Sequence, residues 1–254
     1  MSQIYACHFN DPTNLGDQVC CPVDYFEPLR TACKLDWHSA PDEFTAAPLI
    51  VGGGGLLNPV LGENLAALLL RRKAPVVVWG VGTNVHHETR PYYPEFLNRA
   101  ALVGLRDFGN PFAYVPCPSC MHPALDRAFP VRHEFVIYEH AHHPIGIAPS
   151  APRMANNEPS ERMEGVVEFL ASGELVITNT YHGAFWSLLL GRRILIYRPY
   201  SNRFHFFKPR VVFCDGENWR AKAKEAAGAP GYLDECRRLN REFAEQVFRL
   251  LGFD

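Results

Sequence analysis

Short apolar runs that alternate with longer helical patterns constrain the fold of this chain more than any other feature. A run of four to six apolar residues is typical of a buried strand, and a longer amphipathic pattern is typical of a helix. The predicted strands cover residues 4–9, 48–51, 75–79, 101–106, 134–138, 145–148, 174–178, 193–197 and 210–213, and the predicted helices cover residues 58–72, 93–100, 161–172, 181–190 and 232–251. Strand and helix in alternation indicate an α/β fold with parallel sheets covered on both faces.

The alternating pattern breaks once, in the Pro- and Cys-rich stretch 110–130. We therefore expect two Rossmann-like halves, residues 1–125 and 126–254, each of ordinary domain size. Residues 148–160 are rich in Pro, Ser and Asn and are predicted to form a mobile loop. At 254 residues the chain can bury enough surface to fold without a metal or disulfide.

Composition excludes several classes of protein. The net charge of −2 provides no overall field for nucleic acid or an anionic membrane. Residues 1–10 lack the basic start and apolar run of a secretory signal, and no stretch of about 20 apolar residues follows. We expect a cytoplasmic protein whose eight cysteines are reduced thiols.

Three glycine-containing loops follow predicted strands of the first half, where open α/β sheets bind ligands. Asn14 and Asp17 lie in the first loop, where Asp17 can orient a hydroxyl, act as a base, or simply cap a helix. Gly53 and Gly54 lie in a run of four glycines whose backbone N–H groups can face an anion or permit close packing. Asn84 ends the third loop, and all three should meet at one sheet edge.

Two further segments carry charge or a titratable ring. Arg106 ends a predicted strand and can hold a carboxylate or phosphate through two hydrogen bonds, or pair with Asp107 or Glu95. His182 lies in the first turn of a predicted helix, where it can contact an anion or deliver a proton, or pack in the core.

Cysteine and histidine clusters suggest metal binding only weakly. Cys117 and Cys120 have the spacing of a zinc corner, but no second such pair exists, so we predict no metal. The segments 86–88 and 139–143 are His-rich and lie near predicted strand ends. Basic and aromatic residues also alternate over residues 192–210, which can bind sugars or phosphates or form a half-buried surface.

Taken in order, the motifs at residues 14–17 (NLGD), 51–56 (VGGGGL), 79–83 (WGVGT) and 178–183 (TNTYHG), with Arg106, resemble the polysaccharide pyruvyltransferase family. The resemblance implies a two-domain fold similar to the glycosyltransferase-B arrangement, with the site between the halves. It also implies transfer of a pyruvyl group from phosphoenolpyruvate to sugar hydroxyls, as a ketal, in the synthesis of a surface polysaccharide such as a capsule or exopolysaccharide.

The resemblance also implies roles for individual residues. His182 would be the acid and Asp17 the base. The residues expected to bind the donor are Arg106, Gly53, Gly54, Asn179 and Thr180, and those expected to bind the acceptor are Asn14, Asn84 and Arg203. The scheme needs no metal and no cofactor besides the donor substrate. The acceptor would be a glycan or a lipid-linked glycan, through which the protein would reach a membrane surface, and nucleic acid is not expected.

Two departures from the family pattern keep other functions open. Thr180 stands where family members often have Arg, so Arg153, Arg198 or Arg203 would have to replace that cation. A Pro- and Cys-rich segment, residues 116–120, stands where a Gly-Asp-Pro type segment is expected. The alternatives are a glycosyltransferase of similar shape that uses a nucleotide-activated sugar, and a binding protein without catalysis.

Overall fold

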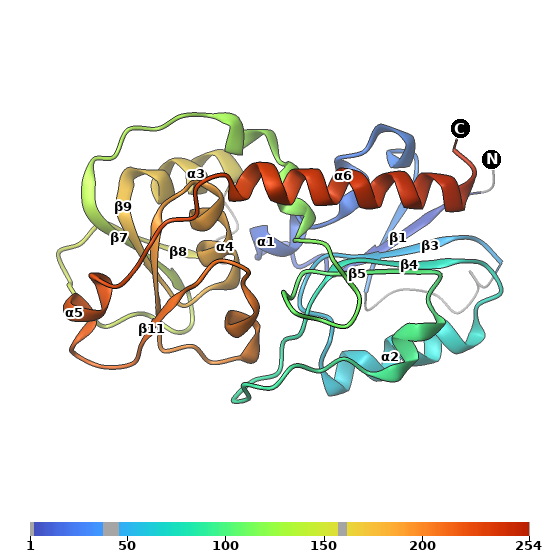
Figure 1. The fold of residues 1–254 in the computed structure, drawn as a ribbon, viewed down its shortest axis with the longest axis horizontal. Helices are drawn as coiled ribbons and strands as arrows, with labels where there is room; N and C mark the ends of the chain where they lie inside the picture. The colour runs from blue at the N-terminus through green and yellow to red at the C-terminus, as the bar shows by residue number, and fades with distance from the viewer. Residues whose placement is uncertain (1–2, 38–45, 157–161, 254) are drawn as a thin grey trace.

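Two parallel sheets lie side by side and are flanked by helices (Figure 1). The computed structural model describes residues 3–37, 46–156 and 162–253. The α/β class with two Rossmann-like halves is therefore confirmed.

The first sheet has six strands in the order β2-β1-β3-β4-β5-β6. Every neighbouring pair is parallel, so the carboxyl ends of these strands lie along one edge. The strands are β1 (Tyr5–His8), β2 (Cys33–Asp36), β3 (Leu49–Gly52), β4 (Val76–Val81), β5 (Leu102–Leu105) and β6 (Ala113–Tyr114).

The second sheet has five strands in the order β11-β10-β9-β7-β8, again all parallel. Its central strands are apolar and buried, as expected for strands covered on both faces. The strands are β7 (His133–His140), β8 (Arg153–Asn156), β9 (Gly173–Thr178), β10 (Arg193–Tyr197) and β11 (Val212–Cys214).

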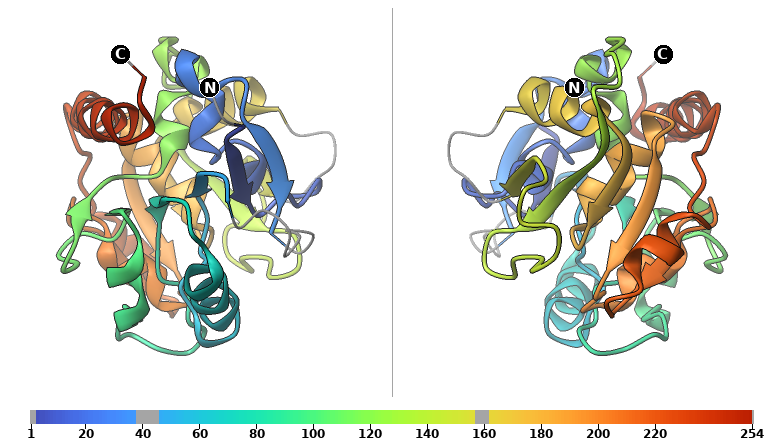
Figure 2. Two further views of the ribbon diagram at one scale, coloured as in Figure 1. Left: turned by 90° about the vertical axis from the view of Figure 1, so that its right-hand side faces the viewer. Right: turned by 90° about the vertical axis from the view of Figure 1, so that its left-hand side faces the viewer.

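Helices pack against the faces of both sheets (Figure 2). The α-helices are α1 (Leu15–Gln18), α2 (Pro59–Arg71), α3 (Met163–Ser172), α4 (Tyr181–Leu189), α5 (Trp219–Ala223) and α6 (Tyr232–Leu251). Short 3₁₀ helices are η1 (Pro22–Asp24), η2 (Glu27–Leu29), η3 (Glu95–Arg99), η4 (Pro118–Met121), η5 (Pro123–Asp126) and η6 (Asn202–Phe206). The predicted helix at 93–100 is thus only the 3₁₀ turn η3.

The predicted strand at residues 145–148 is wrong. The loop predicted from residue 148 is confirmed for residues 148–152 and wrong for residues 153–156, which form a strand. Strand β8 lies within that loop and pairs with β7, whereas residues 145–148 are irregular. The Arg153 guanidinium donates to the carbonyls of Ile145, Ile147 and Ala148, so these carbonyls bond to a side chain and not to a neighbouring strand. The same guanidinium pairs with Glu139 at 2.9 Å. The rest of that predicted loop, residues 157–160, lies outside the described residues.

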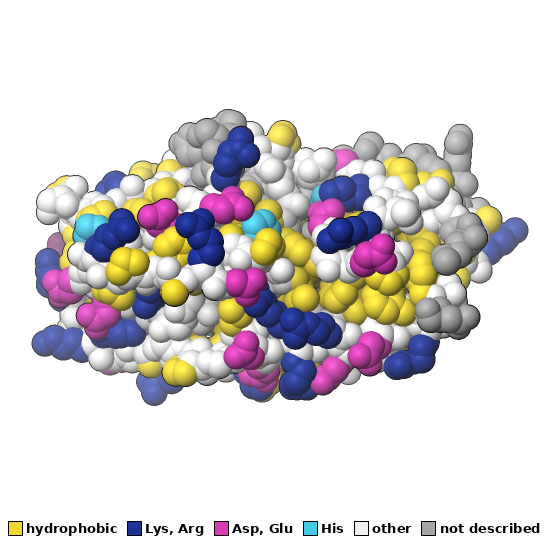
Figure 3. All heavy atoms as spheres, turned by 90° about the horizontal axis from the view of Figure 1, so that it is seen from above, with side chains coloured by type: hydrophobic (Ala, Val, Ile, Leu, Met, Phe, Trp, Pro, Cys, Tyr) yellow, Lys and Arg dark blue, Asp and Glu magenta, His cyan; other side chains and the backbone are white. Residues whose placement is uncertain are grey.

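Helix α6 joins the two halves. It runs across both sheets (Figure 1), with Tyr232 and Cys236 packed in the core around α3 and α4, and with Phe243 and Val247 packed on the first sheet. Its outward side carries charges of both signs (Figure 3). The boundary at 125/126 stays a prediction, although the second-half segment α6 packs largely on the first half.

Asn240 fixes α6 against the first sheet. This side chain is fully buried; its Oδ1 accepts from Trp79 Nε1 at 2.9 Å, and its Nδ2 donates to the Pro116 carbonyl at 3.1 Å. Trp79 stacks edge-on with Phe243 from the same helix. One amide therefore ties β4, the linker between the halves, and α6 together.

Replacing Asn240 with Leu should strongly destabilise the protein. The change leaves the Trp79 indole N–H and the Pro116 carbonyl buried without partners, so we expect a loss of about 2–4 kcal/mol in the free energy of unfolding. Urea denaturation under reducing conditions measures it. Gln246→Leu, an equivalent change on the exposed side of α6, should alter stability by less than about 0.5 kcal/mol. Equal effects of the two variants would contradict the role of Asn240.

Candidate functional site

Motifs from both halves meet where the carboxyl edges of the two sheets face each other. Arg106 follows β5 of the first sheet, and Tyr181 and His182 begin α4 after β9 of the second. The Arg106 guanidinium lies over the Tyr181 ring, 3.7 Å from its centroid, so the predicted convergence of Arg106 and His182 occurs.

Helix α1 brings Asp17 to this meeting point. Asn14 caps the helix: its Oδ1 accepts from the Gly16 N–H at 3.1 Å, and its Nδ2 donates to Asp17 Oδ2 at 2.8 Å. Asn14 thus orients the Asp17 carboxylate, and Asp17 itself does not cap the helix.

Gly16 makes the contact between α1 and His182 possible. A Cβ atom at residue 16 would lie 1.9 Å from His182 Nδ1, far inside van der Waals distance. The imidazole of the second half therefore rests directly on the backbone of the first, and any larger residue at 16 has to displace it.

His182 is held on its other sides as well. Cys117 Sγ lies 3.6 Å from Nε2, and the ring stacks on Trp186 with centroids 5.0 Å apart. Trp186 Nε1 in turn donates to Ser119 Oγ at 3.1 Å. Burial, together with the positive charges of Arg106 and Arg203, holds the pKa of His182 well below its usual range, so the unliganded ring is neutral.

Arg106 is buried, at 3% exposure, yet its Nε and Nη1 groups have no hydrogen-bond partner in the described part of the chain. The expected alternative was a salt bridge with Asp107. The Asp107 carboxylate instead accepts from the Thr83 N–H at 2.7 Å and from the Tyr93 hydroxyl at 3.3 Å. Two nitrogens of a buried cation are thus left without a partner among the described residues, and a bound ligand can supply one.

Arg203 supplies a second guanidinium beside the first. It stacks over Tyr200 and Phe204, and its Nε is also without a partner among the residues described. Burial lowers the pKa of Arg203, as does the charge of Arg106, and Asp17 opposes that shift. The preceding residue, Asn202, bonds to Val85 and Thr83 of the first half, so both halves position Arg203.

The three arginines proposed to replace a missing cation at Thr180 differ in their surroundings. Arg203 interacts with Arg106 and Asp17. Arg153 binds Glu139 and three carbonyls, and Arg198 donates to the Asp215 carbonyl at 3.1 Å. Arg203, predicted to face the acceptor, therefore lies next to the residues predicted to bind the donor.

Other predicted site residues have structural roles. The Gly53 N–H donates to the Trp79 carbonyl at 2.9 Å, so this amide is not open to an anion as predicted. Asn179 bonds to the backbone of His140 and His143, and Thr180 Oγ1 caps α4 by accepting from the Gly183 N–H at 3.0 Å. Their side chains shape the loop that presents His182.

Gly54 lies close to Asp17, and Asn84 has an amide oxygen without a partner among the described residues. A Cβ at Gly54 would lie 3.8 Å from Asp17 Oδ1, so its φ of +80° and missing side chain leave that carboxylate uncrowded. The buried Oδ1 of Asn84 lacks a partner in the part of the chain that the structure covers, and the side chain packs against Gly55.

Sequence reasoning missed Tyr181, Cys117 and Tyr200 as members of the site. The TNTYHG motif contained Tyr181, and only the fold reveals that its ring faces Arg106. All eight cysteines are free thiols, and across residues 3–37, 46–156 and 162–253 no group of three or more His, Cys, Asp or Glu side chains could hold a metal. Within the same ranges no helix is both long and apolar enough to cross a bilayer.

Comparisons with known proteins support the fold alone. The sequence matches no family model and no curated protein. The crystal structure of a functionally uncharacterized protein from Klebsiella pneumoniae subsp. pneumoniae superposes with a TM-score of 0.52 at 16% identity, over 84% of this chain and 93% of that one. The two-lobed parallel α/β architecture is thus shared, and the chemistry has to be argued from the site itself.

A methyl group at residue 16 tests the contact between the halves. Gly16→Ala should displace the His182 ring and destabilise the protein by about 1–3 kcal/mol, because the new Cβ overlaps the imidazole. NMR of ¹³C-labelled histidine reports the ring environment, and urea denaturation reports stability. Gly165→Ala, in α3 with no atom near its Cβ position, should be neutral or stabilising by up to about 1 kcal/mol. An unmoved His182 signal in Gly16→Ala would contradict the contact.

The carboxyl group of Asp17 should titrate near neutrality. Burial raises its pKa from 3.8 to about 6, while Arg106 and Arg203 act in the opposite direction. Because the folded value exceeds the unfolded one, ionisation of Asp17 destabilises the fold as pH rises from 3.8 to about 6. Carboxyl ¹³C NMR, assigned with Asp17→Asn, should give a midpoint near 6, and Arg106→Gln should raise it further. A midpoint near 3.8 in both proteins would refute this electrostatic description.

Proposed function

We propose that this protein is a transferase that moves a pyruvyl group from phosphoenolpyruvate to a sugar acceptor, as a ketal, in the synthesis of a surface polysaccharide. The observation that carries the proposal is the buried, incompletely bonded Arg106 guanidinium beside a neutral His182. The resemblance of the ordered sequence motifs to polysaccharide pyruvyltransferases supports the choice of donor.

A buried guanidinium with two unpaired N–H donors favours an anionic ligand. Desolvating an ion costs several kcal/mol, and the Tyr181 ring face offsets only part of that. Nε and Nη1 point to different sides of the guanidinium, so each can donate to a different oxygen of a bound anion. A donor that supplies those oxygens therefore gains affinity from groups that the free protein leaves unsatisfied.

Two guanidinium groups suit a donor with two acidic groups. Phosphoenolpyruvate carries a carboxylate and a phosphate on the same carbon. Arg106 and Arg203 lie near each other and near Asp17, so each acidic group can meet one cation. In this scheme Arg203 takes over the role of the Arg that many family members have at the position of Thr180.

His182 would supply the proton that starts the reaction. Burial, together with the charges of Arg106 and Arg203, keeps its ring neutral in the free protein, and a bound dianionic phosphate offsets the two arginines and favours the imidazolium. The proton moves from His182 to the methylene carbon, which becomes a methyl group and leaves the central carbon electrophilic.

Asp17 would accept a proton from the sugar. Its pKa of about 6 leaves it mostly ionised at neutral pH and still basic enough to assist a hydroxyl. One hydroxyl oxygen bonds to the central carbon, and a second hydroxyl of the same sugar displaces phosphate. Of the two hydroxyl protons, one restores the proton that His182 gave to carbon and the other leaves on the phosphate. The sum is phosphoenolpyruvate plus a diol giving a ketal plus inorganic phosphate, without oxidation or reduction.

A nucleotide-sugar donor remains the competing proposal, and one observation favours it. A pocket of about 270 Å³ lies at the carboxyl end of β10 and is lined in part by Tyr197, Arg198 and Tyr200. Aromatic rings with an arginine suit a base and a phosphate. The donor-binding experiment below separates the two proposals.

Titration calorimetry with phosphoenolpyruvate tests the donor. We expect wild-type protein to bind it, and Arg106→Gln to weaken binding about 100-fold or more, because one acidic group loses its buried cation. Arg249→Gln, on the exposed side of α6, should bind as tightly as wild type. Thermal denaturation identifies any variant that fails to fold.

Two results of these binding measurements would overturn the proposal. If UDP-glucose or GDP-mannose gave heat with the wild-type protein and phosphoenolpyruvate gave none, the donor would be a nucleotide sugar. Equal affinity of wild type and Arg106→Gln for phosphoenolpyruvate would remove Arg106 from the site.

A further inference from the structure

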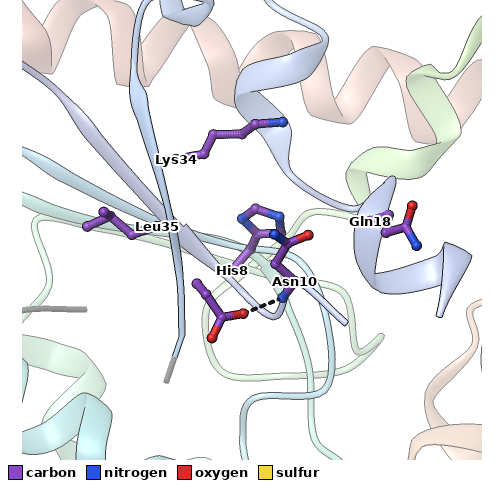
Figure 4. A pocket seen from close by; sticks show the side chains of 6 residues that line it. His8, Asn10, Gln18, Lys34 and Leu35 are labelled. Atoms are coloured by element: carbon purple, nitrogen blue, oxygen red, sulfur yellow. Dashed lines mark hydrogen bonds between the residues drawn. The ribbon is translucent and has the colours of Figure 1, made fainter. Parts of the chain in front are cut away.

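A separate pocket of about 250 Å³ lies at the carboxyl ends of β1 and β2. Figure 4 shows its lining, which comes from β1, β2, α1 and the loop after β1. The lining residues are His8, Asn10, Gln18, Lys34, Leu35 and Asp36, five of them polar. Pockets for drug-sized ligands typically have volumes of about 300–1,000 Å³, so this smaller pocket suits a single small ring.

His8 is the strongest sign that this pocket binds a ligand. It ends β1 and is only 3% exposed, yet its Nδ1 has no hydrogen-bond partner within the described ranges. Burial, followed by the charge of Lys34, lowers the pKa of His8, so the ring is neutral and offers one donor and one acceptor. A buried polar atom facing a pocket without a partner calls for one from outside.

The charges around the pocket argue against an anion. The Lys34 ammonium group pairs with Asp24 at 2.9 Å, and the Asp36 carboxylate accepts from the Asn10 N–H at 2.9 Å. The Lys34 cation is therefore paired with a carboxylate, and Asp36 adds a second negative charge. Gln18 Nε2 donates to the Asp11 and Pro12 carbonyls, at 3.3 and 2.7 Å, which leaves Gln18 Oε1 as an acceptor. With the Asn10 amide, a carboxylate and a neutral imidazole, the lining has both donors and acceptors, which suits a neutral ligand rich in hydroxyl groups.

We propose that this pocket binds one neutral hexose unit of the acceptor glycan. The designation as acceptor rests on the proposed transferase function, whereas the affinity for a neutral sugar does not. Gln18 directly follows Asp17 on α1, so the pocket borders the helix that carries the proposed base. Both sites also lie at the same edge of the first sheet, since His8 and Leu105 each end a parallel strand.

Saturation-transfer NMR with the methyl glycosides of glucose, galactose and mannose tests the proposal. We expect at least one glycoside to receive saturation from the full-length wild-type protein. His8→Phe, which keeps a ring but removes its nitrogens, and Gln18→Leu should each weaken that binding about five- to tenfold. Gln246→Leu, the same change on exposed α6, should leave it unaltered.

Two further arms separate this pocket from the donor site. Arg106→Gln should bind the glycoside as wild type does while losing phosphoenolpyruvate, and saturating phosphoenolpyruvate should not displace the glycoside. If phosphoenolpyruvate fails to bind but the glycoside still depends on His8 and Gln18, the sugar pocket stands and the pyruvyl donor falls.

The proposal is overturned if no glycoside receives saturation, or if His8→Phe and Gln18→Leu bind it as wild type does. Circular dichroism establishes whether the His8→Phe protein is folded. If it is not, the exposed Gln18→Leu variant compared with Gln246→Leu decides the question alone.

Discussion

The contact between the Gly16 backbone and the His182 ring is the constraint on which the site depends. It brings the amino end of α4 onto α1, and so places a second-half imidazole beside a first-half carboxylate and guanidinium. Each partner is fixed separately: Asn14 caps α1, Thr180 caps α4, and Asn240 holds α6 against the first sheet. The halves therefore form one site because glycine allows them to approach closely.

The sequence predicted the fold well wherever burial decides the structure. The apolar runs of β3, β4, β9 and β10 and the amphipathic pattern of α6 were all placed within about two residues. The prediction from sequence failed where exposed strands or single polar side chains determine the local structure. β2 (Cys33–Asp36) is a largely exposed edge strand without an apolar run, and Arg153 binds the carbonyls of residues that were predicted to be a strand.

The candidate site was predictable to the level of loops but not of atoms. Parallel strands place their carboxyl ends at one edge, so the grouping of Asp17, Arg106 and His182 follows from topology. Which polar groups remain unpaired depends on side-chain geometry. Gly53, Asn179 and Thr180 looked as suitable for anion binding as Arg106 did, and their groups are bonded within the protein.

The site's electrostatics make sense only when a ligand is included. Two guanidinium groups lie together with a neutral imidazole, and two carboxylates of raised pKa, Asp17 and Asp107, interact with them. Without a bound anion, Nε and Nη1 of Arg106 and Nε of Arg203 stay buried without hydrogen-bond partners among the described residues, which a core built for stability alone would avoid. With a doubly acidic donor bound, the unpaired guanidinium nitrogens would gain partners and His182 would be easier to protonate. The free protein thus holds its charges in the arrangement that a bound anion completes.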